Sequence, residues 1–182
     1  MANTILVLTR VAADNVDSLN HTAIATTDVM NGALLTLETG LSNLPGKPYV
    51  FNATPLADAN AHVEFYMACS PEVNVTADGS LLYKGINVDP RNFINQAGYE
   101  FDVFSVQIGD IVQVSAPFFA ANFDPGTVTG ATVVEYDATN TGMAAKVSAT
   151  DDYAGIQFQI LKSQPIPVGH DSVPAWLLRR VK

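Results

Sequence analysis

The chain of 182 residues contains a single cysteine, Cys69. One cysteine excludes an internal disulfide and a cysteine-rich zinc site, and it favours synthesis in the cytoplasm. No apolar run approaches the roughly 20 residues of a membrane-spanning helix. The apolar run at residues 4–8 is shorter than the core of a signal peptide and has no basic residues before it. We therefore expect no membrane contact.

Charged residues are also scarce, at 15% of the chain, and basic ones more so. Lys and Arg total 9 against 18 Asp and Glu, which gives a net charge of −9. Proteins that bind nucleic acids usually neutralise phosphates with many basic side chains, so we expect no nucleic-acid partner. Hydrophobic residues make up 48% of the chain, which predicts a packed globular protein.

The usual marks of catalysis are missing as well. The three histidines, His21, His62 and His170, are scattered, and none has a second His or Cys at the spacing of metal ligands. The sequence has no HExxH, GxSxG or P-loop motif. His62 and Cys69 are an odd number of residues apart, which places them on opposite faces of a strand. We expect no enzyme activity, no catalytic residue, no metal site and no cofactor.

Short runs of Val, Ile, Thr and aromatic residues, separated by Gly, Pro, Asn and Asp, predict an all-β fold, either an antiparallel sandwich or a barrel. The clearest strand is residues 156–160, where Ile and Phe alternate with Gln. Gly109 and Asp110 predict a tight hairpin over residues 102–114. Further strands are expected at residues 4–11, 33–38, 49–53, 63–69, 111–115, 132–136 and 144–149.

One short helix is predicted at about residues 90–97. Asp89 can cap its start, Pro90 suits the first helical position, and Gly98 can end it. The composition changes after residue 161, so we expect a β-rich domain at residues 1–161 and a proline-containing segment at 162–182. That segment is either a last strand that folds back on the body or an arm that anchors on another subunit.

Several residues are candidates for an interface with a capsid or another subunit. Trp and Arg are enriched at interface hot spots, which favours the C-terminal segment. Three phenylalanines lie close together in an expected loop, and they either form contact surface or plug one end of a barrel. The strand at residues 4–11 can pair with a neighbour as an edge strand. The candidates are Ile5, Val7, Phe118, Phe119, Phe123, Trp176, Arg179 and Arg180.

The order of several segments resembles one known family. These segments are residues 28–37, 67–73, 93–98, 107–115, 145–149 and 156–161. The chain resembles the capsid decoration, or cement, proteins of tailed bacteriophages, in particular small β-rich head proteins of phages that infect Gram-positive hosts. It departs from them at Tyr99-Glu-Phe101, where relatives carry a basic residue, and in residues 162–182, which look like an addition.

The resemblance implies a virion structural protein, made in the host cytoplasm, that binds the outer surface of an icosahedral capsid and stabilises contacts between capsomers. Its partner would be the major capsid protein, and it implies no catalytic residues. Symmetry favours self-association as a trimer. The alternative is a head-fibre or spike domain that binds host carbohydrate or a receptor through Tyr66, Tyr83 and Tyr99.

Overall fold

The computed structural model contains strands and short 3₁₀ turns in the part of the chain that it describes, and no α-helix there. The all-β prediction is confirmed. Each expected strand at residues 4–11, 33–38, 49–53, 63–69, 111–115, 132–136 and 144–149 contains all or part of an observed strand. Residue 63 of the fourth and residues 146–149 of the last lie outside the described part of the chain. The described residues are 3–41, 49–56, 64–70, 73–75, 81–83, 90–121, 123–127, 132–137, 142–145 and 155–182.

Five strands form a closed barrel in the order β2-β4-β3-β5-β8. Its interior combines small side chains with a few large ones, since Ala23, Ala53 and Ala68 pack against Leu35 and Phe101. Small residues leave room for the large rings inside a narrow barrel. The barrel strands are β2 (Asn20–Ile24), β3 (Leu34–Leu41), β4 (Val50–Pro55), β5 (Tyr66–Ala68) and β8 (Glu100–Ser105).

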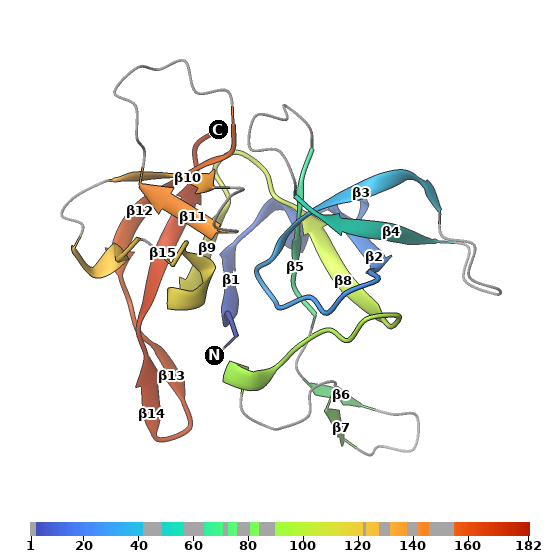
Figure 1. The fold of residues 1–182 in the computed structure, drawn as a ribbon, viewed down its shortest axis with the longest axis horizontal. Coiled ribbons are helices and arrows are strands. Elements are labelled where there is room, and N and C mark those ends of the chain that lie inside the picture. Colours follow the sequence, from blue (N-terminus) through green and yellow to red (C-terminus); the bar gives the residue numbers. More distant parts are fainter. Residues whose placement is uncertain are drawn as a thin grey trace.

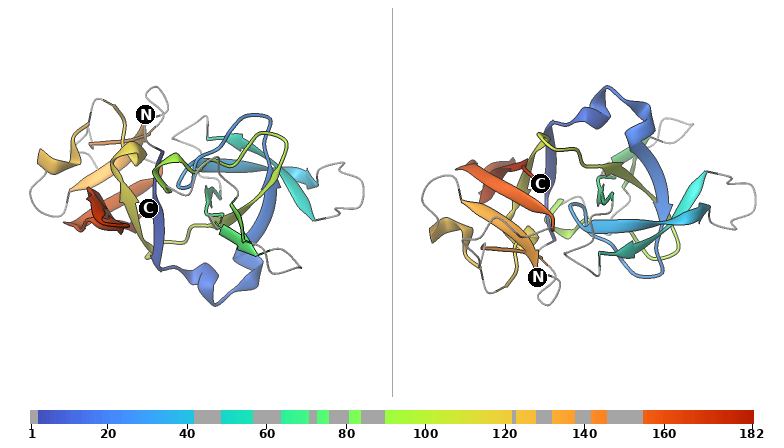
Figure 2. Two further views of the ribbon diagram at one scale, coloured as in Figure 1. Left: turned by 90° about the horizontal axis from the view of Figure 1, so that it is seen from below. Right: turned by 90° about the horizontal axis from the view of Figure 1, so that it is seen from above.

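The other lobe lies beside the barrel in Figures 1 and 2. It is a six-stranded antiparallel sheet in the order β1-β9-β15-β12-β10-β11. The chain starts in this sheet, builds the barrel, and then returns to complete the sheet. The strands are β1 (Leu6–Arg10), β9 (Ile111–Ser115), β10 (Val133–Asp137), β11 (Gly142–Ala145), β12 (Gln157–Ser163) and β15 (Ala175–Arg180).

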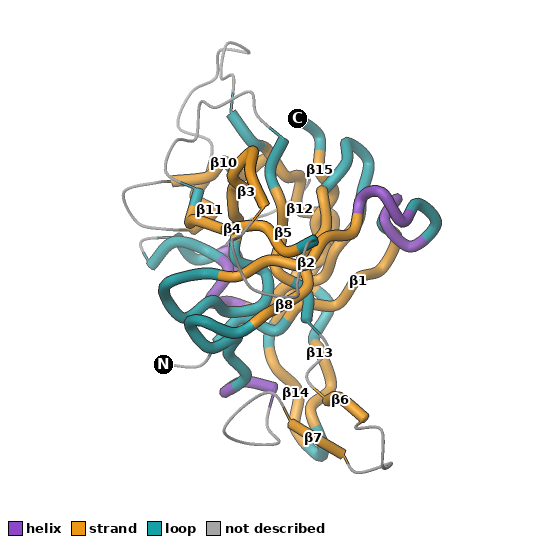
Figure 3. Tube along the Cα trace, turned by 90° about the vertical axis from the view of Figure 1, so that its right-hand side faces the viewer, coloured by secondary structure: helices purple, strands orange, loops and turns teal. Residues whose placement is uncertain are grey.

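Two hairpins complete the fold, and both project from the same end of the molecule in Figures 1 and 3. One pairs β13 (Ile166–Val168) with β14 (Asp171–Val173), and the other pairs β6 (Val73–Val75) with β7 (Leu81–Tyr83). The 3₁₀ turns are η1 (Ala12–Asp14), η2 (Asp17–Leu19), η3 (Pro90–Asn92), η4 (Ala116–Phe118) and η5 (Pro125–Thr127).

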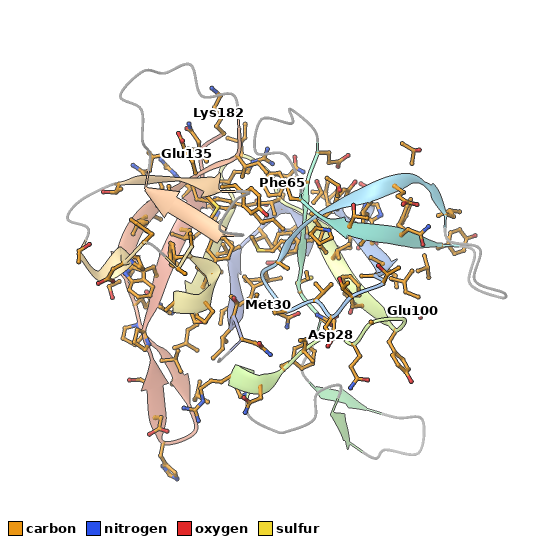
Figure 4. The ribbon with its side chains drawn as sticks, in the orientation of Figure 1. Asp28, Met30, Phe65, Glu100, Glu135 and Lys182 are labelled. Carbon is orange, nitrogen blue, oxygen red and sulfur yellow. The ribbon has the colours of Figure 1, made fainter. Side chains whose placement is uncertain are left out.

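One hydrophobic core joins the barrel to the sheet. Phe65 and Phe104 from the barrel side belong to the same buried cluster as Phe158 and Leu178 from the sheet. The rings of Phe65 and Phe158 meet edge to face with centroids 6.4 Å apart, and Phe65 lies at the junction of the lobes in Figure 4. In β12, Phe158 and Ile160 are buried on the core side, which confirms the apolar face predicted there, although Gln157 on the opposite face is only 8% exposed as well. The lobes are therefore held together by shared packing.

The predicted hairpin over residues 102–114 is wrong. β8 pairs with β2 and β5 in the barrel, whereas β9 pairs with β1 and β15 in the sheet. Gly109 does adopt the expected positive φ, at 98°. However, the buried carboxylate of Asp110 accepts hydrogen bonds from the backbone N–H groups of Gln107 (2.7 Å) and Ala12 (2.8 Å). The turn is thus the crossover between the two lobes.

The predicted helix at about residues 90–97 is also wrong, because only the single turn η3 forms. Asn95 instead makes an antiparallel bridge to Val29, with N–H to oxygen distances of 2.8 and 2.9 Å. These bonds occupy backbone groups that a helix would use within itself. Gly98 has the positive φ expected of it, at 77°, and Asp89 lies outside the described residues.

The C-terminal segment continues the sheet. Residue 161, where we expected a boundary, lies inside β12, and β15 lies between β9 and β12. Both edges of β15 are therefore paired: Leu178, for example, lies opposite Val112 of β9 on one side and opposite Ile160 of β12 on the other. Residues 175–180 form a central strand of the sheet and not an arm.

Candidate interaction surface

Most of the residues that the sequence suggested for an interface are inside the protein. The exposed fraction is 4% for Ile5, 6% for Phe118 and for Phe119, and 7% for Trp176, and Phe123 is partly buried. Ile5 lies beneath the hairpin β13-β14, with Ile166 and Ala175. Only Val7 and Arg179 of the eight are well exposed.

The aromatic candidates form one cluster in the core. The ring of Phe119 lies 5.6 Å from that of Phe118, 5.7 Å from that of Phe123 and 5.5 Å from that of Trp176, measured between centroids. They belong to the core shared with the sheet and are not among the residues that fill the barrel. Phe118 and Phe119 are therefore buried between the sheet and the outside of the barrel, where they offer little contact surface, and they do not fill the barrel interior.

Arg180 also has a structural role, because it fastens the end of β15 to the crossover. Its guanidinium carbon lies 4.4 Å from the centroid of the Phe65 ring. Its Nη1 donates to the carbonyl oxygen of Val106, and its Nε donates to that of Lys182 at 3.2 Å. Burial lowers the pKa of Arg180, and the negative charge of Asp110 partly opposes this effect. A side chain engaged in this way is poorly suited to bind a partner.

The sheet has one face against the core and one face pointing outward. Strand alternation places Leu6, Val114 and Leu178 toward the core. The outward positions follow two cross-strand rows, set by the registers of β1, β9, β15 and β12. The first row is Val7, Gln113, Leu177 and Lys162, and the second is Arg10, Ile111, Arg179 and Gln159.

The hairpin β13-β14 covers only part of this outward side. The side-chain amide of Gln113 donates to the carbonyl oxygen of Gln164 at 2.6 Å, next to the start of the hairpin, and Gln113 is only 6% exposed. Beyond it the sheet is open to solvent. We use the name "open face" for Val7, Arg10, Ile111, Lys162, Leu177 and Arg179, all of which are half-buried or exposed.

The open face is basic although the protein is acidic. It carries three of the nine basic residues of the chain, Arg10, Lys162 and Arg179. The nearby Glu135, on β10, is only 8% exposed, and it accepts a hydrogen bond of 3.0 Å from Gln157. Three cations beside the aliphatic side chains of Val7, Ile111 and Leu177 suit an acidic protein surface.

β1 also leaves one edge of the sheet unpaired among the described residues, since it pairs only with β9. Its side chains Val7 and Leu8 are 39% and 36% exposed. The register shifts between Leu8 and Arg10, which is a bulge at Thr9. Bulges limit pairing along an edge, so the regular part of the free edge is residues 5–8.

The described residues include Cys69 and two of the three histidines, His21 and His170. No group of three or more His, Cys, Asp or Glu side chains among them could hold a metal ion. Burial raises the pKa of Cys69 to about 12, with smaller contributions from Asp102 and Asp14, so this thiol stays protonated at neutral pH. His62 lies outside the described residues. In the same part of the chain, no helix has the length and hydrophobicity to span a membrane.

The tyrosines considered for carbohydrate binding do not form a common platform. Tyr66 is 9% exposed and packs inside the barrel, whereas Tyr99 is 69% exposed. The side chain of Tyr83 lies outside the described residues. An exposed platform would require all three rings at the surface.

Comparison of the chain with protein-family models, with curated proteins and with solved structures finds no match. The fold and the open face are therefore the basis for a functional proposal, together with the resemblance in segment order. Sequence reasoning missed Arg10, Ile111, Lys162 and Leu177. The alternation of β9 and β15 marks Ile111 and Leu177 as outward, but only the strand order shows that they are neighbours.

Proposed function

We propose that this protein is a structural component of a bacteriophage virion that binds the outer surface of an icosahedral capsid and stabilises contacts between capsomers. The observation that carries the proposal is the open face: an exposed basic patch beside a free strand edge, on a protein with a net charge of −9. A surface of this kind is suited to lasting contact with an acidic partner.

The physical basis of stabilisation is linked equilibrium. A ligand that binds assembled but not dissociated subunits stabilises the assembly by RT ln(1 + [L]/Kd), about 2.7 kcal/mol at a ligand concentration of one hundred times Kd. This effect is repeated at every site on a symmetric shell. A weak individual contact is therefore sufficient, and self-association as a trimer would strengthen it through multivalency.

The test is decoration of purified capsid shells by the isolated protein. We expect saturation at an icosahedral ratio to the capsid subunit and a higher melting temperature of the decorated shell. Arg10→Gln should weaken binding, because it removes one cation from the open face. Gln96→Glu is the matched control, since it changes the net charge by the same amount at an exposed position outside the open face.

The proposal is wrong if shells remain undecorated, or if they bind only a few dozen copies. Equal loss of binding in Arg10→Gln and Gln96→Glu would show that net charge matters and the open face does not. The isolated protein should elute as a trimer in size-exclusion chromatography with light scattering. A monomer would remove the multivalent part of the proposal.

A further inference from the structure

A slot runs along the free edge of β1, between the hairpin and the barrel. It has a volume of about 360 Å³ and is lined by Ile5 and by residues 6–8 of β1. Ile166 and Val168 of the hairpin line it as well, as do Asn31, Ser70 and Pro90, which follow barrel strands or belong to η3. A chain that lies in this slot would be beside β1, between two walls.

Two contacts lie near the Ile5 end of the edge. The Arg91 guanidinium lies 3.8 Å from the Asp171 carboxylate, which links η3 to the hairpin. The backbone N–H of Asn3 donates to the carbonyl oxygen of Arg91 at 2.6 Å, which ties Asn3 to η3. At its other end the edge finishes at the bulge before Arg10. The regular edge between these limits is four residues, or about 13 Å of strand.

The edge presents backbone groups to the slot. Ser115 donates its N–H to the carbonyl oxygen of Ile5, so Ile5 and Val7 are the positions that bond to β9. In an antiparallel pair the intervening residues direct their N–H and C=O groups away from the partner strand. The backbone groups of Leu6 and Leu8 therefore point toward the slot.

We propose that the slot receives one extended segment of an acidic partner, which adds to the sheet as a seventh strand beside β1. This inference rests on the proposed function, so the segment belongs to the capsid surface. Backbone hydrogen bonds to Leu6 and Leu8 supply affinity. Side chains of the segment that point outward lie beside Val7 and Arg10, where a carboxylate pairs with the cation.

Charge and shape select this occupant. Arg10 at the open end of the slot and Arg179 two strands away attract a carboxylate and repel a basic segment. The slot has a volume of about 360 Å³, and the hairpin residues Ile166 and Val168 and the barrel-side residues Asn31 and Ser70 line it beside β1. A second copy of this protein would bring its own hairpin and barrel to the same edge, and it shares the net charge of −9.

Backbone pairing is tested by Leu8→Pro. Proline removes the N–H that points into the slot without removing a bond to β9, and proline is tolerated on edge strands. Leu8→Ala is the matched control, because it loses the same side chain and keeps the N–H. We expect Leu8→Pro to bind shells at least tenfold more weakly than Leu8→Ala, with both variants melting cooperatively. Similar affinity of the two folded variants would overturn the inference.

A second measurement tests the inference even if Leu8→Pro does not fold. A photo-crosslinking amino acid at Val7 should attach the protein to one segment of the capsid subunit, and mass spectrometry should show carboxylates within that segment. The same group at Tyr99, on the barrel side, should not attach to it. Crosslinks from Val7 to another copy of this protein, or to a segment without carboxylates, would overturn the inference. If one of these results overturns the inference but the shells are still decorated, the proposed function stands. If the wild-type protein does not decorate shells, the proposed function itself is refuted.

Discussion

The crossover between the lobes depends on one carboxylate. Asp110 is 5% exposed and accepts hydrogen bonds from the N–H groups of Ala12 and Gln107 at 2.8 and 2.7 Å. Asp110→Ala removes both acceptors. Both donors belong to half-buried residues, and a donor that loses its partner away from solvent costs about 1–3 kcal/mol, so we expect a loss of about 4 kcal/mol of unfolding free energy for the pair. This is a large fraction of the roughly 5–15 kcal/mol that stabilises a typical domain.

The assay is urea denaturation followed by circular dichroism. With a denaturant dependence of about 2 kcal/mol per molar, the midpoint should fall by about 2 M. Asp110→Asn keeps one acceptor oxygen and should lose about half as much. Asp124→Ala is the control, because the exposed Asp124 also accepts from a backbone N–H, that of Gly126 at 2.8 Å, and water can replace it there.

Equal stabilities of Asp110→Ala and Asp124→Ala would refute this account. Asp110 would then be an ordinary turn residue, as in a simple hairpin, and the connection between the crossover and residue 12 would contribute nothing. A change in the denaturant dependence itself would also contradict it, since the native fold should be the same in both variants.

Two further predictions concern the C-terminal strand and the cysteine. A chain that ends at residue 161 should fail to give a cooperative melt by circular dichroism, because it loses β15, which pairs with both β9 and β12; a cooperative melt would show that the sheet closes without β15. The native Cys69 thiol should react with a disulfide reagent at pH 8 far more slowly than in the unfolded chain, because its pKa is raised to about 12. The raised pKa also means that the contribution of this thiol to stability is complete below about pH 9 and is lost as the pH rises from 9 toward 12. The difference in unfolding free energy between wild type and Cys69→Ala should therefore change between pH 8 and pH 10.5. The same difference at both pH values would contradict this prediction.

Local patterns in the sequence predicted local features well. The alternation at residues 156–160 correctly placed Phe158 and Ile160 toward the core, because a half-buried strand has a period of two. Gly98 and Gly109 have positive φ values, as their positions in turn sequences suggested. These features depend on a few neighbouring residues and on the conformational freedom of glycine.

Features that depend on distant residues were not predicted. The turn at Gly109 was correct, but its flanking strands pair with distant strands, and Asp110 in the turn accepts a hydrogen bond from Ala12, 98 positions earlier in the chain. The residues before Gly98 have helical signals, yet Asn95 pairs with Val29 instead. In both cases tertiary hydrogen bonds outweigh a weak local preference.

Most of the candidate interface residues were also placed wrongly, because the sequence alone does not show which aromatic side chains the tertiary structure buries. Composition suggested Trp176 and the three phenylalanines because aromatic side chains are common in binding sites, but the same side chains are what a large core requires. The structure uses them to cover the side of the sheet that faces the barrel. What remains outside is the set of positions one residue out of phase, Ile111, Leu177 and Arg179.

This phase relation explains why Arg179 lies on the open face. β15 reads Ala-Trp-Leu-Leu-Arg-Arg, and its core side takes Trp176, Leu178 and Arg180, so Leu177 and Arg179 must point outward. Arg180 can lie on the core side only because Phe65 and the carbonyl oxygen of Val106 hold its guanidinium. The two adjacent arginines therefore have different roles: Arg180 joins the lobes, and Arg179 supplies charge to the open face. In the observed register the guanidinium of Arg179 donates a hydrogen bond of 2.9 Å to Gln159 on the outward face, so the register that builds the core also places this charge on the open face.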